Sequence, residues 1–285
     1  MVLHIVSVTY RLFRALSLDV VLGSLAGMAA AAHIRSVSLP WSVYTLLAAT
    51  VWLIYTGDHL LDGRRRGPQA RMYRHRLHAR FFKPLLVLAL LDFLLAMYLV
   101  VFHLPRELIA PGLVLAACSG VHLLLAQWNR LKAYPKELVI AIIYACGIWL
   151  APVIMSRQPV DPTGILLFVQ FGGTAFLNLW LFSIMEAEHD AREAMPAAAQ
   201  FRSDHRSVFL FALAAIGTVS MGTGALALSL LRNAVQFRWP LTFLLVSAVQ
   251  ILAFFVREPL RARERYRLLC DGAFLLYALP LVFLP

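Results

Sequence analysis

Apolar runs of about 20 residues recur from one end of the sequence to the other, and a helix of that length crosses the hydrocarbon core of a bilayer. The chain has 285 residues, of which 61% are hydrophobic and 14% are charged, and its mean hydropathy is +0.74. Soluble domains do not show such a composition. No polar stretch is large enough to form a soluble domain of its own. The sequence therefore predicts an integral membrane protein with one all-α transmembrane domain over residues 1–285.

The apolar runs predict nine membrane-spanning helices. The first run follows Arg14 and superficially resembles a signal peptide, but we expect it to be retained because many further spans follow it. Several connections are so short that neighbouring helices must run antiparallel. The predicted spans are residues 15–34, 40–61, 82–103, 107–128, 137–155, 163–186, 207–231, 239–256 and 268–284.

Positive charge is distributed unevenly between the two sides of this predicted bundle. All but five of the 26 Lys and Arg residues fall on the side that holds the N-terminus. Such a bias predicts a cytoplasmic N-terminus and, after nine spans, a C-terminus outside. It also accounts for the net charge of +11, so no nucleic acid is expected as a partner. We expect the plasma membrane, the inner membrane of a bacterium, with the site facing the cytoplasm. The five residues on the other side are Arg35, Arg106, Arg157, Arg232 and Arg238.

Two pairs of acids mark the cytoplasmic ends of two predicted helices. Asp58 and Asp62 stand four residues apart after one long apolar run, and Glu186 and Asp190 stand four apart after another. Residues at this spacing project from one face of a helix, where like charges repel unless a cation lies between them. Carboxylate oxygens suit Mg²⁺ that carries a phosphate-bearing ligand. The four acids are therefore the candidate metal ligands and catalytic residues.

Basic residues follow both acid pairs. The acid-pair helices, residues 40–62 and 163–190, each lead into a basic cytoplasmic loop, residues 63–81 and 191–206. Such loops bind anionic lipid headgroups at about 1 kcal/mol per charge, but guanidinium groups also match phosphate oxygens. Candidate ligands of a diphosphate include Arg65 in the first loop, Lys132 between the fourth and fifth helices, and Asn178, which lies on nearly the same helix face as Glu186.

The first acid pair resembles a motif of the UbiA superfamily of intramembrane prenyltransferases. In that family the motif reads N-D-x-x-D-x-x-x-D. Its last two acids align with Asp58 and Asp62, and its first two positions fall on Ile54 and Tyr55. The nine-helix topology with the N-terminus inside is also similar to that family, so the resemblance covers almost the whole chain.

Three further segments carry the resemblance. The family's second motif, D-x-x-x-D, is similar to Glu186 and Asp190, with Glu in place of the first Asp. The family's K-R segment between the fourth and fifth helices resembles Arg130-Leu131-Lys132. Its arginine near the start of the first helix resembles Arg11 or Arg14.

This resemblance implies a function. Mg²⁺ would bridge the four acids to a prenyl diphosphate whose chain threads a cavity open to lipid. The isoprenyl group would pass to an aromatic or lipid-like hydrophobic acceptor, while Mg²⁺ and basic side chains stabilise the departing diphosphate. The residues implied to bind the diphosphate are Lys132, Arg130, Arg65, Arg14 and Asn178.

Other functions remain open at this stage. A UbiA-type terpene cyclase would share every residue named above, and a catalytically silent lipid-binding or structural membrane protein needs none of the chemistry. The D-G-x-x-A-R signature of the CDP-alcohol phosphotransferases is absent, since three arginines follow Asp62-Gly63. A transporter would predict polar residues at mid-membrane, and only Asp92 and Asn178 interrupt the predicted spans in this way.

Overall fold

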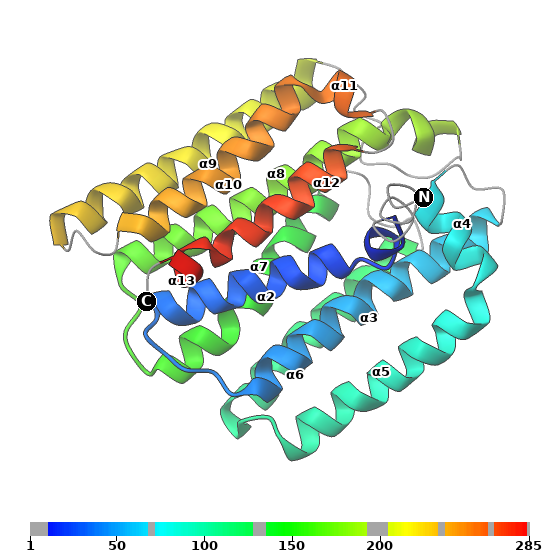
Figure 1. Cartoon of the computed structure of the whole chain (residues 1–285), viewed down its shortest axis with the longest axis horizontal. Coiled ribbons are helices and arrows are strands. Elements are labelled where there is room, and N and C mark those ends of the chain that lie inside the picture. The colour runs from blue at the N-terminus through cyan, green and yellow to red at the C-terminus, as the bar shows by residue number, and fades with distance from the viewer. Residues whose placement is uncertain are drawn as a thin grey trace. The chain divides into compact units, whose positions relative to one another are not determined.

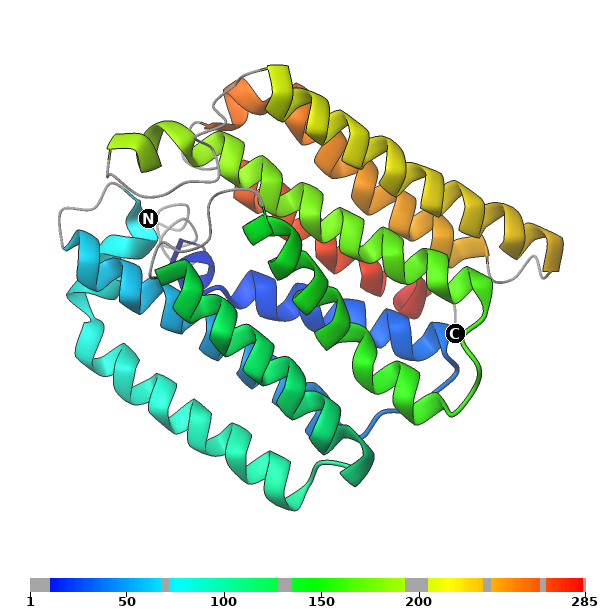
Figure 2. The same cartoon turned by 180° about the vertical axis from the view of Figure 1, so that it is seen from behind.

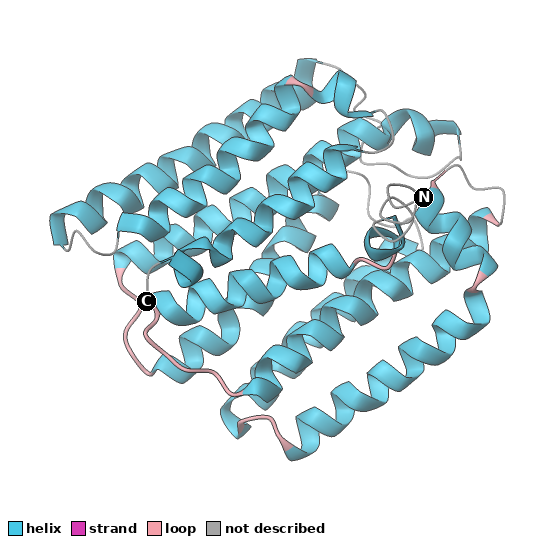
Figure 3. Ribbon diagram, in the orientation of Figure 1, coloured by secondary structure: helices cyan, strands magenta, loops and turns pink. Residues whose placement is uncertain are grey.

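The computed structural model describes residues 11–67, 72–127, 135–192, 205–232, 237–261 and 265–283. Within these ranges the chain forms helices with short connections and no strand (Figures 1 and 3). A helix satisfies its own backbone hydrogen bonds, which a chain inside lipid requires. The helices are α2 (Leu18–Ile34), α3 (Trp41–Arg66), α4 (Tyr73–Arg80), α5 (Phe82–Phe102), α6 (Arg106–Gln127), α7 (Pro135–Ser156), α8 (Pro162–Arg192), α9 (His205–Arg232), α10 (Arg238–Phe255), α11 (Arg257–Arg261), α12 (Arg265–Ala273), the 3₁₀ helix η4 (Phe274–Ala278) and α13 (Leu279–Phe283).

Six of the described helices, α5 to α10, are long and apolar enough to cross a membrane. The chain is therefore an integral membrane protein of the all-α class, as predicted. The other three predicted spans correspond to α2, which has 17 residues, to α3, whose last third is polar, and to a C-terminal segment divided among α12, η4 and α13. The total of nine spans and the sides on which the two termini lie stay predictions.

Much of the first predicted basic loop, residues 63–81, is helical. α3 continues to Arg66, and α4 begins at Tyr73 after a break around Gly67. Gly67 has a φ of 71°, a left-handed conformation that glycine adopts without strain. Of the second predicted loop, residues 193–204 lie outside the described residues.

Contacts between residues group the chain into two compact units. Unit 1 comprises Met1–Leu25 and Pro40–Arg106, and unit 2 comprises Ala26–Leu39 and Glu107–Pro285. In unit 1, α5 lies along α3 and the short α4 folds back onto the end of α3 (Figures 1 and 2). The apolar side chains of α5 are mostly exposed, as expected of a helix that faces lipid.

In unit 2, α9 runs antiparallel to both α8 and α10, so α8 and α10 run in the same direction (Figure 2). Along α8, Trp180 contacts the start of α9 by donating to the Ser207 carbonyl at 3.3 Å. Earlier on α8, a Cβ added to Gly173 would lie 2.4 Å from the Thr218 hydroxyl, further along α9. Small residues permit such close approach between membrane helices.

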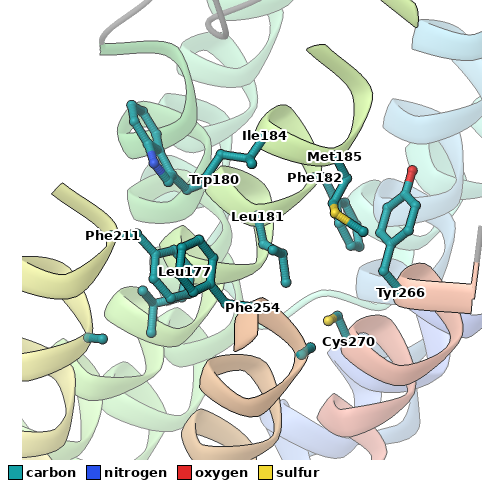
Figure 4. Close-up of a cluster of buried hydrophobic side chains, with 12 residues drawn as sticks. Leu177, Trp180, Leu181, Phe182, Ile184, Met185, Phe211, Phe254, Tyr266 and Cys270 are labelled. Carbon is teal, nitrogen blue, oxygen red and sulfur yellow. The ribbon is translucent and has the colours of Figure 1, made fainter. Parts of the chain in front are cut away.

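Buried hydrophobic side chains join α8, α9, α10 and α12 at the end of α8 that leads to Arg192. Figure 4 shows this cluster, in which the Phe211 and Phe254 rings are stacked with centroids 4.2 Å apart. Tyr266 and Cys270 of α12 complete it. The cluster therefore fixes α12 beside the last turns of α8, where Glu186 lies.

Candidate functional site

Both acid pairs occupy successive turns of a continuous helix. α3 runs through Asp58 and Asp62 to Arg66, and α8 runs through Glu186 and Asp190 to Arg192. Each pair therefore has the helical spacing that the sequence predicts. The side chain of Asp190 lies outside the described residues. The first pair belongs to unit 1 and the second to unit 2.

The first acid pair lies where α4 packs on α3. Asp58 is 42% exposed and its Oδ2 lies 3.7 Å from Nδ1 of His59. Asp62 is 14% exposed and its Oδ2 lies 3.7 Å from Nε2 of His75 on α4. Gly63 makes this approach possible, because a Cβ there would lie 2.9 Å from the backbone nitrogen of Ala79. One acid thus faces solvent while the other is covered by α4.

Three buried histidines form a cluster beside this acid pair. The ring of His59 lies 5.1 Å from that of His78 and 6.1 Å from that of His75, between ring centroids. Nδ1 of His78 donates to the Arg74 carbonyl at 2.8 Å. Burial lowers the pKa of His78, chiefly because an imidazolium would lose its hydration there. Nε2 of His78 is buried and has no hydrogen-bond partner within the described ranges.

Our sequence reasoning missed these histidines. His75 and His78 lie in the segment that is predicted to be a basic loop. The prediction for that segment depends on its arginines and assigns no role to its histidines. Their spacing of three residues places them on one face of a helix, and His59 directly follows Asp58. That pattern was the available signal, but it gains meaning only when the segment is known to be helical and to pack on α3.

The second acid pair is tied to α12. Glu186 forms an ion pair with Arg267 and accepts a hydrogen bond from the Tyr266 hydroxyl at 2.9 Å. Glu186 is buried, and the Arg267 guanidinium also lies 4.5 Å from the centroid of the Phe182 ring. The charge of this predicted metal ligand is therefore already matched by a protein cation. A metal ion that bound Glu186 would have to compete with Arg267.

Two further polar contacts occur along α8. Asn178, predicted as a diphosphate ligand, donates from Nδ2 to Oδ1 of Asp271 at 3.0 Å. Glu137, near the start of α7, accepts a hydrogen bond from Ser183 at 2.7 Å and is buried. The sequence predicts no role for Glu137 or Asp271. Both acids lie in apolar surroundings, where a carboxylate needs such partners.

The predicted diphosphate-binding cations are only partly described. Arg65 is exposed near the end of α3. Nε of Arg14 lies 4.0 Å from Oδ2 of Asp19, an interaction within unit 1. Arg130 and Lys132 lie outside the described residues. Of the five residues predicted to bind a diphosphate, the structure therefore describes Arg14, Arg65 and Asn178.

The donor atoms present decide what kind of metal site is possible. No group of three or more His, Cys, Asp or Glu side chains in the described part of the chain is placed to hold a metal ion. However, Mg²⁺ usually takes only one or two carboxylates and completes its shell with water and phosphate oxygens. Asp58 and Asp62 supply two carboxylates, which is the type and number of protein ligands that Mg²⁺ usually takes. This pair suits a cation that arrives together with a phosphate-bearing ligand.

Comparison with known proteins identifies no relative, because no family model, curated protein or solved structure matches the chain. Its function must be inferred from its own residues.

Proposed function

We propose that this chain is a Mg²⁺-dependent intramembrane prenyltransferase, which moves an isoprenyl group from a prenyl diphosphate to an aromatic or lipid-like acceptor. One observation carries the proposal: α3 and α8 both extend beyond their apolar segments and present two acids one turn apart. A pair of carboxylates at the end of a membrane helix meets the polar head of a lipid-like substrate while its chain stays among apolar side chains.

The residues of the chain would have the following roles. Mg²⁺ bound with the substrate would neutralise diphosphate charge and so favour its departure. Asp58, the more exposed acid, and Asp62 would hold a Mg²⁺ ion from α3. Glu186 and Asp190, on α8, are likewise proposed as metal ligands. Arg267 pairs with Glu186, and its guanidinium is a group that could bind phosphate oxygens.

The buried ion pair also favours a second function, a catalytically silent lipid-binding or structural membrane protein. In that case Glu186 serves only to join α8 to α12 through Arg267 and Tyr266. The two functions differ in what substitution of an acid does. In a catalytically silent protein, substitution of Glu186 lowers stability, and there is no enzymatic activity for it to affect.

The test uses the full-length chain in lipid nanodiscs with Mg²⁺ and labelled prenyl diphosphates of several chain lengths. We expect pyrophosphate release that EDTA abolishes. Asp58→Asn is expected to reduce the release at least about 100-fold, the size of effect seen when a group that stabilises a charged transition state is removed. Glu258→Gln, at an acid that is 68% exposed on α11, serves as the control and should retain full activity.

Identification of the product separates transfer from cyclisation. A prenylated acceptor supports the transferase, and a cyclic hydrocarbon or alcohol supports a terpene cyclase. Absence of release with every diphosphate, in protein shown to be folded, contradicts both enzyme functions and leaves the silent one. Equal activity in Asp58→Asn and wild type excludes this acid from catalysis.

A further inference from the structure

Buried polar side chains follow one face of α8 through unit 2. Gln170, Thr174 and Asn178 are spaced four residues apart, so they lie on successive turns, and all three are buried. α10 runs alongside in the same direction, and its Ser247 hydroxyl lies 3.0 Å from that of Thr174. Gln250 is three residues further along α10 and is also fully buried. We name these five residues together with Asp271 the polar seam.

Several polar atoms of the seam have no hydrogen-bond partner within the described ranges. They are both side-chain polar atoms of Gln170, both of Gln250, and Oδ1 of Asn178. The set mixes amide N–H donors with oxygen acceptors. A cation could satisfy only the oxygens and an anion only the N–H groups, whereas water both donates and accepts. The chemistry of the seam therefore fits internal water molecules, which commonly bind otherwise unsatisfied buried groups.

Asp271 adds an ionisable group to the seam. Its Oδ1 accepts the hydrogen bond from Asn178. Arg267, which is paired with Glu186, lies one turn before Asp271 on α12. The polar groups thus reach the Arg192 end of α8. Between Gln170 and Glu186 the helix rises about 24 Å, which is most of the roughly 30 Å hydrocarbon core of a bilayer. An ionisable residue within a predicted membrane span, such as Asp271 in residues 268–284, is typical of a pathway for ions or protons.

The C-terminal helix is interrupted beside the seam. α12 ends at Ala273 and gives way to the 3₁₀ helix η4 before α13 begins. Tyr277 of η4 is fully buried, and its ring lies 5.1 Å from that of Phe171 on α8. A 3₁₀ stretch within a helical segment often marks a functional hinge. At membrane depth, backbone that departs from the α-helix occurs where it is buried in protein or lines a hydrated cavity.

We propose that the polar seam is a hydrated path that carries protons through unit 2, with Asp271 as the group that takes them up and releases them. An O–H bond of a hydronium ion breaks as its proton forms an O–H bond on the Asp271 carboxylate, which weakens the hydrogen bond from Asn178. That O–H bond breaks in turn when the proton passes to the next water molecule, where a new O–H bond forms. Nothing is oxidised or reduced, and the electrochemical gradient of protons across the membrane sets the direction. This activity goes beyond prenyl transfer and needs neither Mg²⁺ nor a diphosphate.

The test places the full-length chain in vesicles of phosphatidylcholine and phosphatidylglycerol that enclose the pH indicator pyranine. A potassium diffusion potential set by valinomycin drives protons inward. We expect faster acidification with the wild-type chain than in protein-free vesicles. Asp271→Asn keeps the shape of the side chain but cannot be protonated, so its rate should fall to that of protein-free vesicles. Gln250→Leu removes a water-binding amide and should lower the rate while Asp271 remains in place.

Glu258→Gln, on the exposed surface of α11, is the control and should acidify the vesicles as fast as wild type. Size-exclusion chromatography and helical circular dichroism establish that each variant is folded. Wild-type vesicles that acidify no faster than protein-free ones overturn the proposal, as does a folded Asp271→Asn variant with the wild-type rate. If Asp271→Asn does not fold, Gln250→Leu decides, because an unchanged rate in that variant overturns the proposal. Since no prenyl diphosphate is present, this result is independent of the prenyltransferase assay.

Discussion

Arg267 on α12 forms a buried ion pair with Glu186 on α8, across 81 residues of sequence. The pair joins two helices that also share the hydrophobic cluster around Tyr266 and Cys270. The sequence predicts that the Glu186 carboxylate binds a metal ion. The ion pair gives this carboxylate a second role, because it joins α8 to α12. Any reading of variants at Glu186 must therefore separate stability from activity.

Glu186→Gln is expected to lower the free energy of unfolding by about 3 kcal/mol, because it removes the charge partner of a largely buried guanidinium. Glu107→Gln is the matched control, since Glu107 and Arg157 form an exposed pair whose loss should cost less than about 1 kcal/mol. Chemical unfolding in detergent, followed by circular dichroism, measures both. Equal effects at the two sites would contradict the burial of the Glu186 pair.

Gly63→Ala is expected to disrupt the packing of α4 on α3. The added Cβ would lie 2.9 Å from the backbone nitrogen of Ala79 and 3.2 Å from the His75 carbonyl, and backbone atoms cannot move aside easily. We expect a loss of about 1–3 kcal/mol in the free energy of unfolding. For Gly57→Ala on the same helix, no other described atom beyond the adjacent residues and the helix backbone lies within 4 Å of the new Cβ. This variant should therefore be neutral or stabilising by up to about 1 kcal/mol. A larger loss in Gly57→Ala than in Gly63→Ala would refute this account of the α3–α4 contact.

Stability is expected to fall as the pH drops below about 6.5, the ordinary pKa of histidine. The pKa of His78 is lowered in the folded chain because burial disfavours its charged form. Below pH 6.5 the unfolded chain therefore binds a proton that the folded chain does not, and each pH unit costs up to about 1.4 kcal/mol until the folded pKa is reached. Unfolding curves between pH 8 and pH 5 measure this slope.

His78→Gln should flatten that pH dependence, because glutamine does not titrate. If the slope is the same in His78→Gln as in wild type, another group causes it.

The charge asymmetry of the sequence predicts which segments face the outside. In a chain whose three natural cysteines are replaced by alanine, Arg157→Cys should react with a membrane-impermeant maleimide in intact cells. Arg65→Cys should react only after the membrane is permeabilised, since basic segments stay on the inner side. Gel-shift labelling measures both. Labelling of Arg65→Cys in intact cells would reverse the orientation and place the first acid pair outside.

The sequence by itself determined that this chain is helical and lies in a membrane. Long apolar runs allow no other backbone structure in lipid, because each N–H and C=O must find its partner within the segment. It also determined the spacing inside each acid pair, since residues four apart share a helix face wherever the helix continues. Both helices continue past their acid pair, because α3 extends to Arg66 and α8 extends to Arg192.

Only the tertiary structure decided which side chains meet those acids. His75 approaches Asp62 because Gly63 lets α4 pack closely on α3, and Arg267 reaches Glu186 because a hydrophobic cluster holds α12 beside α8. Neither contact has a local signal, since the partners come from helices whose packing depends on the shape of whole surfaces. The polar seam is of the same kind: Gln170, Gln250 and Asp271 look unremarkable along the chain and form a set only when α8, α10 and α12 lie together.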